Sequence, residues 1–346
     1  MTTLTTSDPA DGADADDTET PAPLLDVRDL HVTYQQGGRD VPAVRGVDFT
    51  LERGGTLGIA GESGCGKSTM ALSLLRLHGG NAKVTGEVLF NGQNLLTTRW
   101  VKLRAVRWAG ASVVFQGAMS ALNPVRTVLD QITEPMVLHD RTAPKEAERR
   151  AAELLDSVGI PRRRARSYPH EFSGGQRQRI MIAMALACRP ELIIADEPTT
   201  ALDVMVQAQI LELLGELVRE SGIAVIMITH DLSLLAHTCE RLAVMYAGRI
   251  VELGPSRQVL EDPQHPYTRA LSRAFPTIGD PASRRAPTGL AGDPPRPSDT
   301  TAGCAFAPRC PEAEDACRTG EMLLWPAAPG RTSACLHART RHGGAS

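Results

Sequence analysis

A run of glycines and hydroxyl side chains around one lysine has the residue types and spacing needed to bind phosphate. It fits the pattern G-x-x-x-x-G-K-[ST], follows the apolar stretch 56–60 and leads into a segment with helical character. Glycines let backbone N–H groups close around a phosphate, and the helix start adds positive potential. The predicted loop for a nucleoside triphosphate consists of Gly61, Glu62, Ser63, Gly64, Cys65, Gly66, Lys67, Ser68 and Thr69.

Within this loop, two side chains have the chemistry to act on the end of a triphosphate. The Lys67 ammonium can reach the β and γ oxygens, and the Ser68 hydroxyl can bind Mg²⁺. A chance glycine turn is the alternative, but a strand before the loop and a helix after it favour phosphate binding. A nucleoside triphosphate and Mg²⁺ are therefore the expected ligands, and both ATPases and GTPases carry such loops.

Two adjacent carboxylates end a second apolar stretch. Asp196 and Glu197 follow residues 192–195, which are all apolar. Asp196 is suited to hold Mg²⁺ through water, and Glu197 to orient or deprotonate the water that attacks the γ-phosphate. Such a pair could also be a strand end that meets solvent. With the phosphate loop upstream, we predict phosphoryl chemistry.

A second helix start with small residues follows later in the chain. Phe172 precedes Ser173, Gly174, Gly175 and Gln176, and a helical pattern continues from there. The hydroxyl, the glycine amides and the helix dipole together favour an anion. One chain thus carries two predicted phosphate-binding helix starts.

In this order the motifs resemble the ABC (ATP-binding cassette) ATPase family. The family signature is Leu-Ser-Gly-Gly-Gln, and Phe172 here replaces its leucine. The resemblance extends over residues 24–271 and implies four further positions. They are Tyr34 as the aromatic that stacks on adenine, Gln116 as the Q-loop, Asp203 after the catalytic carboxylates and His230 as the switch histidine.

The resemblance implies a mechanism that needs two chains. The signature of one subunit would cover ATP held by the phosphate loop of the other in a head-to-tail dimer. His230 would contact the γ-phosphate, and Gln116 would sense Mg²⁺ and water and relay movement to the helical region. Taken singly, Gln116 could be a polar loop residue, His230 a strand-end cap and Tyr34 an ordinary strand aromatic.

Further segments resemble the ATPases of peptide and nickel uptake systems in bacteria and archaea. They are residues 115–124, 167–173 and 265–271. The resemblance implies a second ATPase subunit, expected to be a paralogue, two transmembrane permease subunits and an extracellular solute-binding protein. The chain would then lie on the cytoplasmic face of the membrane. A non-transport ABC ATPase in DNA repair or on the ribosome, an exporter subunit and a regulatory ATPase are the rivals.

Four of the seven cysteines crowd the last part of the chain. Their spacings of five, six and seventeen intervening residues differ from the C-x₂-C of zinc fingers. Thiolates are ligands for iron–sulfur clusters, and the pattern resembles the extension of dipeptide-type ATPases, so a 4Fe-4S cluster is the preferred hypothesis. Zn²⁺, a disulfide or free thiols remain alternatives. The residues are Cys304, Cys310, Cys317 and Cys335.

The overall composition limits the class of protein. With a net charge of −3 and 42% hydrophobic residues, the chain lacks the basic excess of most nucleic-acid binders, and we expect no nucleic-acid partner. No apolar run approaches the ~18–20 residues that span a bilayer, and no signal peptide is recognisable. Residues 1–23 are acidic with almost nothing to bury, which predicts a disordered tail.

The elements that must position these motifs alternate along the chain. Short apolar strands alternate with helical segments, which predicts an α/β core with a mostly parallel sheet. For residues 24–271 the resemblance implies a P-loop ABC domain with a RecA-like core, an antiparallel β subdomain and a helical subdomain at about 97–168. Residues 272–346, rich in proline and glycine, are expected to form a small loop-rich extension with the four cysteines.

Overall fold

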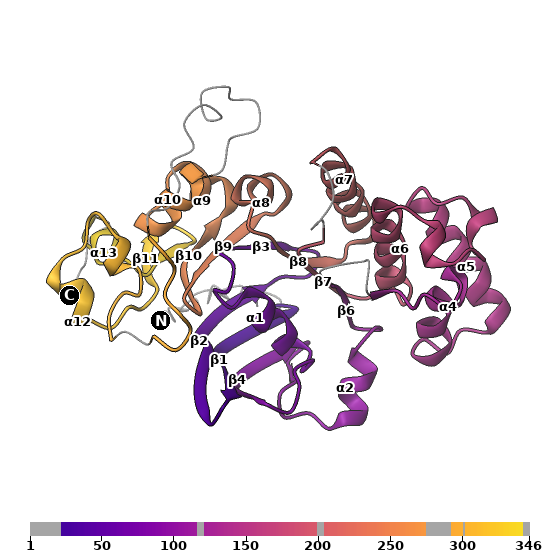
Figure 1. The fold of residues 1–346 in the computed structure, drawn as a ribbon, viewed down its shortest axis with the longest axis horizontal. Helices are drawn as coiled ribbons and strands as arrows, with labels where there is room; N and C mark the ends of the chain where they lie inside the picture. The colour runs from indigo at the N-terminus through magenta and orange to yellow at the C-terminus, as the bar shows by residue number, and fades with distance from the viewer. Residues whose placement is uncertain (1–21, 116–120, 199–203, 275–291, 300–301, 342–346) are drawn as a thin grey trace, which may run out of the picture.

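A computed structural model describes residues 22–115, 121–198, 204–274, 292–299 and 302–341. Two sheets and a set of covering helices make up the described chain (Figure 1). Of the predicted site residues, Gln116 and Asp203 lie outside the described residues, as does most of the expected acidic tail.

The smaller sheet is antiparallel and comes from the first part of the chain. Its strand order is β2-β1-β4-β5. Asn91 and Gly92 have φ angles of 49° and 73° at the turn into β5, the left-handed conformation that an Asn-Gly hairpin turn requires. The strands are β1 (Leu25–Gln36), β2 (Arg39–Leu51), β4 (Ala82–Phe90) and β5 (Gln93–Asn94).

The larger sheet has eight strands in the order β11-β12-β10-β9-β3-β8-β7-β6. Strands β9, β3, β8, β7 and β6 run parallel, and every residue of β7 and β8 is buried, as expected of strands covered on both faces. The first six strands along the chain are β3 (Thr56–Ala60), β6 (Ala111–Val114), β7 (Leu192–Asp196), β8 (Ala224–Ile228), β9 (Arg241–Tyr246) and β10 (Arg249–Pro255).

Helices cover both faces of this sheet, and one group gathers beyond β6 (Figure 1). In that group α4, α5 and α6 pack on one another. The helices up to the end of the core are α1 (Lys67–Leu74), α2 (Trp100–Val106), α4 (Val128–Leu138), α5 (Pro144–Ser157), α6 (Gly174–Leu186), α7 (Val204–Ser221), α8 (Leu232–Thr238), α9 (Ser256–Glu261) and α10 (Pro266–Ala274), with 3₁₀ turns η1 (Arg162–Arg164) and η2 (Pro169–Glu171).

The helical region differs from the expectation of about 97–168 at its beginning. Within that range β6 is a strand of the central sheet, paired parallel with β7 from Ala111 to Val114. Strand β6 has only four residues, too few for a strand pattern to be recognised in the sequence. The helices that gather beyond the sheet therefore begin with α4, after β6.

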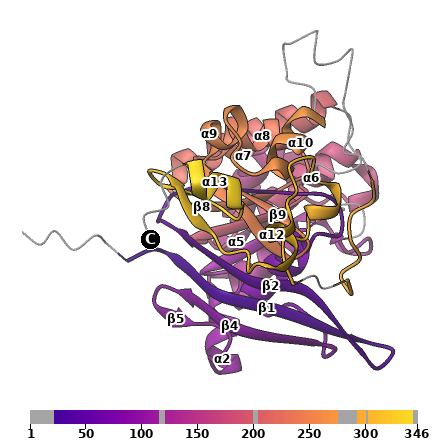
Figure 2. The same cartoon turned by 90° about the vertical axis from the view of Figure 1, so that its left-hand side faces the viewer.

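The last part of the chain extends the central sheet. Strand β12 (Arg331–Ser333) pairs antiparallel with β10, and β11 (Trp325–Ala328) pairs with β12. The rest consists of short pieces: η3 (Ala307–Arg309), α12 (Asp315–Thr319) and α13 (Leu336–Arg341). In Figure 2 the long strands β1 and β2 run below α12 and α13. Part of the expected loop-rich extension is therefore continuous with the core sheet.

Candidate nucleotide-binding and hydrolysis site

The predicted phosphate loop connects β3 to α1. Gly66 caps α1 with a φ of 106°, and a Cβ there would lie 2.4 Å from the Ala43 carbonyl oxygen. A Cβ on Gly61, whose φ is 156°, would lie 2.3 Å from the Met245 carbonyl oxygen. Both positions require glycine because neighbouring backbone leaves no room for a side chain. The loop is thus shaped by its own fold before a ligand arrives.

The Lys67 side chain is held inside the loop that it terminates. It is 5% exposed, and Nζ donates hydrogen bonds to the carbonyl oxygens of Gly61 (2.7 Å) and Glu62 (3.0 Å). A triphosphate would offer the same ammonium stronger, charged acceptors. The Lys67 ammonium is therefore already placed in the loop where phosphate oxygens would bind.

Two oxygen ligands suited to Mg²⁺ meet at the start of α1. The Ser68 hydroxyl donates to Asp196 Oδ1 over 3.1 Å, at the end of β7. Burial raises the pKa of Asp196, the adjacent charge of Glu197 raises it further, and the Ser68 hydrogen bond and Lys67 oppose the rise. A bound cation would supply the positive charge that this buried carboxylate lacks.

The second carboxylate faces a histidine across the ends of two parallel strands. Glu197 has a φ of 43°, and its N–H donates to the Ile228 carbonyl oxygen at 2.9 Å, so the backbone turns at the end of β7. Its Oε1 lies 3.8 Å from His230 Nδ1, just beyond β8. The Glu197 side chain is 19% exposed and that of His230 60%. The structure thus brings together two residues that are far apart in sequence, both able to face an attacking water.

Tyr34 lies on β1, and its hydroxyl already has a partner. The hydroxyl lies 3.0 Å from His78 Nδ1, and His78 Nε2 lies 2.7 Å from Ser73 Oγ in α1. Ser73 donates to the Thr69 carbonyl oxygen, so it accepts from Nε2–H, and Tyr34 then donates to Nδ1. Sequence reasoning missed His78, for which no motif gave a signal. This chain of hydrogen bonds anchors the ring edge beside α1.

The second predicted anion site has the geometry of a well-formed helix start. Ser173 is the N-cap of α6: its hydroxyl accepts from Gln176 N (3.3 Å), and Gln176 Oε1 accepts from Ser173 N (3.2 Å). A Cβ on Gly175 would lie 2.7 Å from Val206 Cγ1, so the glycine lets α6 approach α7. Phe172, in place of the signature leucine, is 3% exposed and packs in the core.

The two helix starts that were predicted to bind anions sit on separate parts of the molecule. Helix α1 packs against β1, β2 and β7, whereas α6 packs against α4, α5, α7 and β6 (Figure 1). Each start therefore has its own supporting elements.

Two family models match the chain. The model described as ABC transporter matches residues 44–200, and the model described as oligopeptide/dipeptide transporter, C-terminal region, matches residues 251–317. The oligopeptide transport ATP-binding protein OppD of Salmonella typhimurium is 46% identical over 324 residues, which cover 92% of this chain and 96% of that protein. This chain belongs to the ABC transporter family of ATP-binding proteins.

Further relatives agree with this membership. The dipeptide transport ATP-binding protein DppD of Bacillus subtilis is 45% identical over 298 residues, or 85% of this chain and 88% of that protein. Among solved structures, the dimeric MJ0796, a bacterial ABC transporter cassette, has a TM-score of 0.61 at 32% identity and covers 67% of this chain and 99% of its own. The expected fold class is confirmed, and like other ABC ATPases the chain hydrolyses ATP, with Mg²⁺ as the usual cation of such sites.

The four cysteines of the extension of this ABC ATPase line one small cavity beside α10 and α13, together with His265 and His337. All seven cysteines are described, and none forms a disulfide. Burial raises the pKa of Cys304 to about 11, so its thiol is protonated at neutral pH. Among the described residues, no three His, Cys, Asp or Glu side chains are arranged to hold a metal ion. The thiols are thus neighbours without the geometry of a formed metal site.

Two contacts to the phosphate loop could not be expected from sequence spacing. The Tyr267 hydroxyl accepts from Glu62 N at 2.9 Å, and Arg309 of the extension pairs with the Glu62 carboxylate at 2.8 Å. The partners are 205 and 247 positions apart along the chain, and neither belongs to a nucleotide-binding motif. Within the described part of this ABC protein, no helix has the length and apolarity to cross a membrane.

Proposed function

We propose that this chain is the ATP-hydrolysing subunit of a bacterial importer of peptides or related small solutes. The observation that carries the proposal is the match of 46% identity to an oligopeptide transport ATP-binding protein along 92% of the chain. The matched C-terminal region of peptide transporters, residues 251–317, supports the same solute class. The chain would work at the cytoplasmic face of the membrane, held there by permease subunits.

The residues at the ends of β3, β7 and β8 divide the hydrolysis between them. Lys67 binds the β- and γ-phosphates. Ser68 would hold Mg²⁺ directly and Asp196 through water, and the cation would neutralise charge on the phosphates. Glu197 orients and deprotonates the attacking water, and His230 contacts the γ-phosphate. The 3.8 Å between the Glu197 and His230 side chains supports a shared position for that water. Gln116 would complete the Mg²⁺ and water contacts, Tyr34 would stack on adenine and Asp203 would belong to the same nucleotide site.

A second copy of the fold completes the site. Ser173, Gly174 and Gly175 of one subunit cover the triphosphate held by the phosphate loop of the other, and Gln176 supports this helix start. The separation of α1 and α6 within one chain supports this division. The partner is expected to be a related but distinct ATPase. ATP closes the pair, and hydrolysis lets it open.

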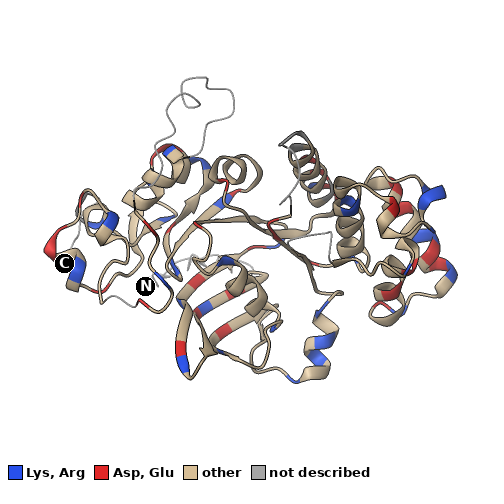
Figure 3. Cartoon of the chain, in the orientation of Figure 1, with Lys and Arg blue, Asp and Glu red and all other residues tan. Residues whose placement is uncertain are grey.

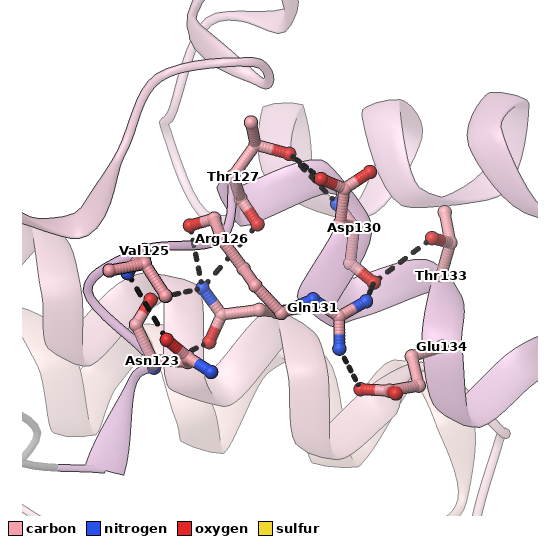
Figure 4. A network of polar contacts seen from close by, with 8 residues as sticks. All are labelled: Asn123, Val125, Arg126, Thr127, Asp130, Gln131, Thr133 and Glu134. Atoms are coloured by element: carbon pink, nitrogen blue, oxygen red, sulfur yellow. Dashed lines mark hydrogen bonds and ion pairs between the residues drawn. The ribbon is translucent and has the colours of Figure 1, made fainter.

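One surface near the start of α4 suits a permease subunit. Figure 4 shows the loop before α4 held by Gln131, whose amide N–H groups donate to the carbonyl oxygens of Asn123 and Arg126, both at 3.1 Å. Gln131 Oε1 accepts from Asn123 N at 2.8 Å. The fixed loop displays Val125, which is 79% exposed. A rigid loop with an exposed apolar tip is suited to transmit movement to a partner.

The expectation of no nucleic-acid partner rests on the net charge of −3. Lys and Arg are interspersed with Asp and Glu over the described residues (Figure 3). On α5, for example, Arg149 pairs with Glu146 and Glu153.

The solute can be tested in proteoliposomes that contain the chain with its permease partners and binding protein. ATP-dependent uptake of labelled di- and oligopeptides should occur and should stop in Lys67→Ala, which loses the phosphate contact. Uptake of nickel complexes should be measured in the same proteoliposomes as the alternative solute. ATP hydrolysis stimulated only by a non-peptide solute would contradict the peptide assignment.

For the extension, residues 272–346, we propose a 4Fe-4S cluster bound by the four cysteines, with Zn²⁺ as the alternative. The shared cavity of Cys304, Cys310, Cys317 and Cys335 supports this proposal. Ligation would require closer approach and loss of the thiol protons. Iron, zinc and acid-labile sulfide should be measured on protein purified without oxygen. Cys304→Ser should lower the iron and sulfide content, whereas the matched variant Cys188→Ser in the core should not. No iron, zinc or sulfide in the wild type would contradict a metal site.

A further inference from the structure

An arginine of the extension forms a two-pronged ion pair with the phosphate loop. Arg309 lies on η3, and its two terminal nitrogens donate to Glu62 Oε2 (2.8 Å) and Oε1 (3.0 Å). The same guanidinium donates to the Tyr246 hydroxyl at 3.2 Å. The Arg309 side chain is 6% exposed and that of Glu62 21%, so water screens the pair only partly. Bidentate pairing of this kind fixes orientation as well as charge.

Glu62 is itself tied to the residue that binds phosphate. Its carbonyl oxygen accepts from Lys67 Nζ at 3.0 Å, and its N–H donates to the Tyr267 hydroxyl at 2.9 Å. With the carboxylate held by Arg309, Glu62 is anchored at three points. Movement of Arg309 would therefore reach the phosphate loop through a single residue.

The charge of Glu62 also needs an explanation. A carboxylate in a loop that must bind a polyanion repels the incoming triphosphate. Arg309 supplies the compensating positive charge from within the same chain, 2.8 Å from the Glu62 carboxylate. Among the described residues, Arg309 is the cation that forms an ion pair with the Glu62 carboxylate.

We propose that Arg309 is a positioning residue for ATP binding: it neutralises and orients Glu62, and so makes the C-terminal extension part of the nucleotide site of its own chain. The inference rests on the ATPase activity alone and is independent of the transported solute. Arg309 acts through Glu62 and need not touch the nucleotide.

The test measures ATP affinity and turnover in the full chain. Arg309→Gln should raise the Kd and KM for ATP about three- to tenfold because Glu62 is left uncompensated, with a larger effect at low ionic strength and little change in kcat. Arg269→Gln is the matched control: Arg269 also joins the core to the extension, but its ion-pair partner is Glu312, at 2.5 Å, rather than a residue of the phosphate loop. It should leave ATP affinity unchanged. Equal affinities of the two variants would overturn the proposal.

A second substitution separates charge from general loosening of the fold. Adding Glu62→Gln to Arg309→Gln removes the repelling carboxylate, so the double variant should recover most of the lost affinity. Arg309→Lys keeps the charge without the fork and should fall between wild type and Arg309→Gln. It also serves as the readout if Arg309→Gln does not fold. The proposal would be overturned if the double variant bound ATP as weakly as Arg309→Gln. It would also be overturned if Arg309→Lys bound ATP as weakly as Arg309→Gln, because either result would show a merely structural role.

Discussion

Two neighbouring carboxylates in this chain differ because their surroundings differ. Asp196 is buried at the strand end, where it accepts a hydrogen bond from Ser68. Glu197 follows on a turned backbone and faces His230. A buried, hydrogen-bonded carboxylate suits a metal ion, whereas a partly exposed one suits a water molecule. Adjacent residues of one chemistry can therefore take separate roles in hydrolysis.

The first prediction concerns the proposed base. Glu197→Gln keeps the shape of the side chain but cannot accept the proton of the attacking water. ATP binding should persist, whereas kcat should fall about 100-fold or more. Equilibrium binding of labelled ATP and single-turnover hydrolysis measure the two effects, and size-exclusion chromatography with ATP should reveal a trapped dimer. Rapid turnover in this variant would refute the role of Glu197.

The second prediction uses the raised pKa of Asp196. Because burial favours the protonated form, Asp196 stays protonated up to a higher pH than an exposed aspartate, whose pKa is ~3.9. Mg²⁺ needs the ionised form, so Mg²⁺-dependent nucleotide binding should weaken as pH falls, beginning above the ordinary aspartate range. Mg²⁺ titrations with a fluorescent nucleotide at successive pH values measure this. Asp196→Asn should bind Mg²⁺ weakly at every pH, and an unchanged pH profile in that variant would contradict the assignment.

At the scale of elements, motifs with a regular period were predictable and short tertiary strands were not. The helical pattern expected from Gln176 onward and the apolar stretch 192–195 correspond to α6 and β7. Helix α1 follows the phosphate loop, as expected, and ends at Leu74. Strands β6 and β12 have too few residues for a pattern, and pairing with distant neighbours decides them. In such short segments, tertiary contacts outweigh the intrinsic strand propensity of the residues.

The candidate site followed the same division. Lys67, Ser68 and Asp196 were predictable because a glycine-rich loop, a helix start and the end of an apolar strand can be recognised in the sequence. In the structure Lys67 donates to the Gly61 carbonyl oxygen and Ser68 donates to Asp196, and their roles toward the nucleotide and Mg²⁺ stay predictions. Arg309 and His78 were not predictable, since their contacts depend on how distant segments pack.

The third prediction tests the loop before α4. Gln131→Leu removes the amide shown in Figure 4 and leaves the Asn123 N–H without its partner, at a cost of about 1–3 kcal/mol. ATP hydrolysis by the isolated subunit should be nearly unchanged, whereas transport in proteoliposomes should fall because the Val125 loop is no longer fixed. Thr133→Ala on the same helix is the control, since the Thr133 hydroxyl donates to the Asp130 carbonyl oxygen within α4 and not to the loop. Equal transport in both variants would contradict the docking role.

At the scale of the whole molecule, the described extension and core behave as parts of one body. Arg331 on β12 donates to Glu252 on β10 at 2.8 Å, and their side chains are 3% and 0% exposed. Glu252 also accepts from the N–H groups of Gln264 and His265, both at 2.9 Å. A carboxylate with these three donors joins β10, β12 and the segment before α10.

The fourth prediction follows from this buried pair. Arg331→Met leaves a fully buried carboxylate without its cation, which should cost about 3–5 kcal/mol and lower Tm by several degrees. The double variant Arg331→Met/Glu252→Gln should be less destabilised than Arg331→Met, because no unpaired charge remains. Differential scanning calorimetry provides the comparison. A single variant as stable as the wild type would show that the pair does not hold the extension.

The pairing of β12 with β10 has a consequence for anyone who shortens this protein. Without β11 and β12, strand β10 would end the sheet with unpaired N–H and C=O groups, which readily recruit strands from other molecules. A minimal cassette cut after α10 would therefore be prone to self-association even if its nucleotide site were intact. Precipitation of such a fragment would report an open sheet edge, and would say nothing against its chemistry.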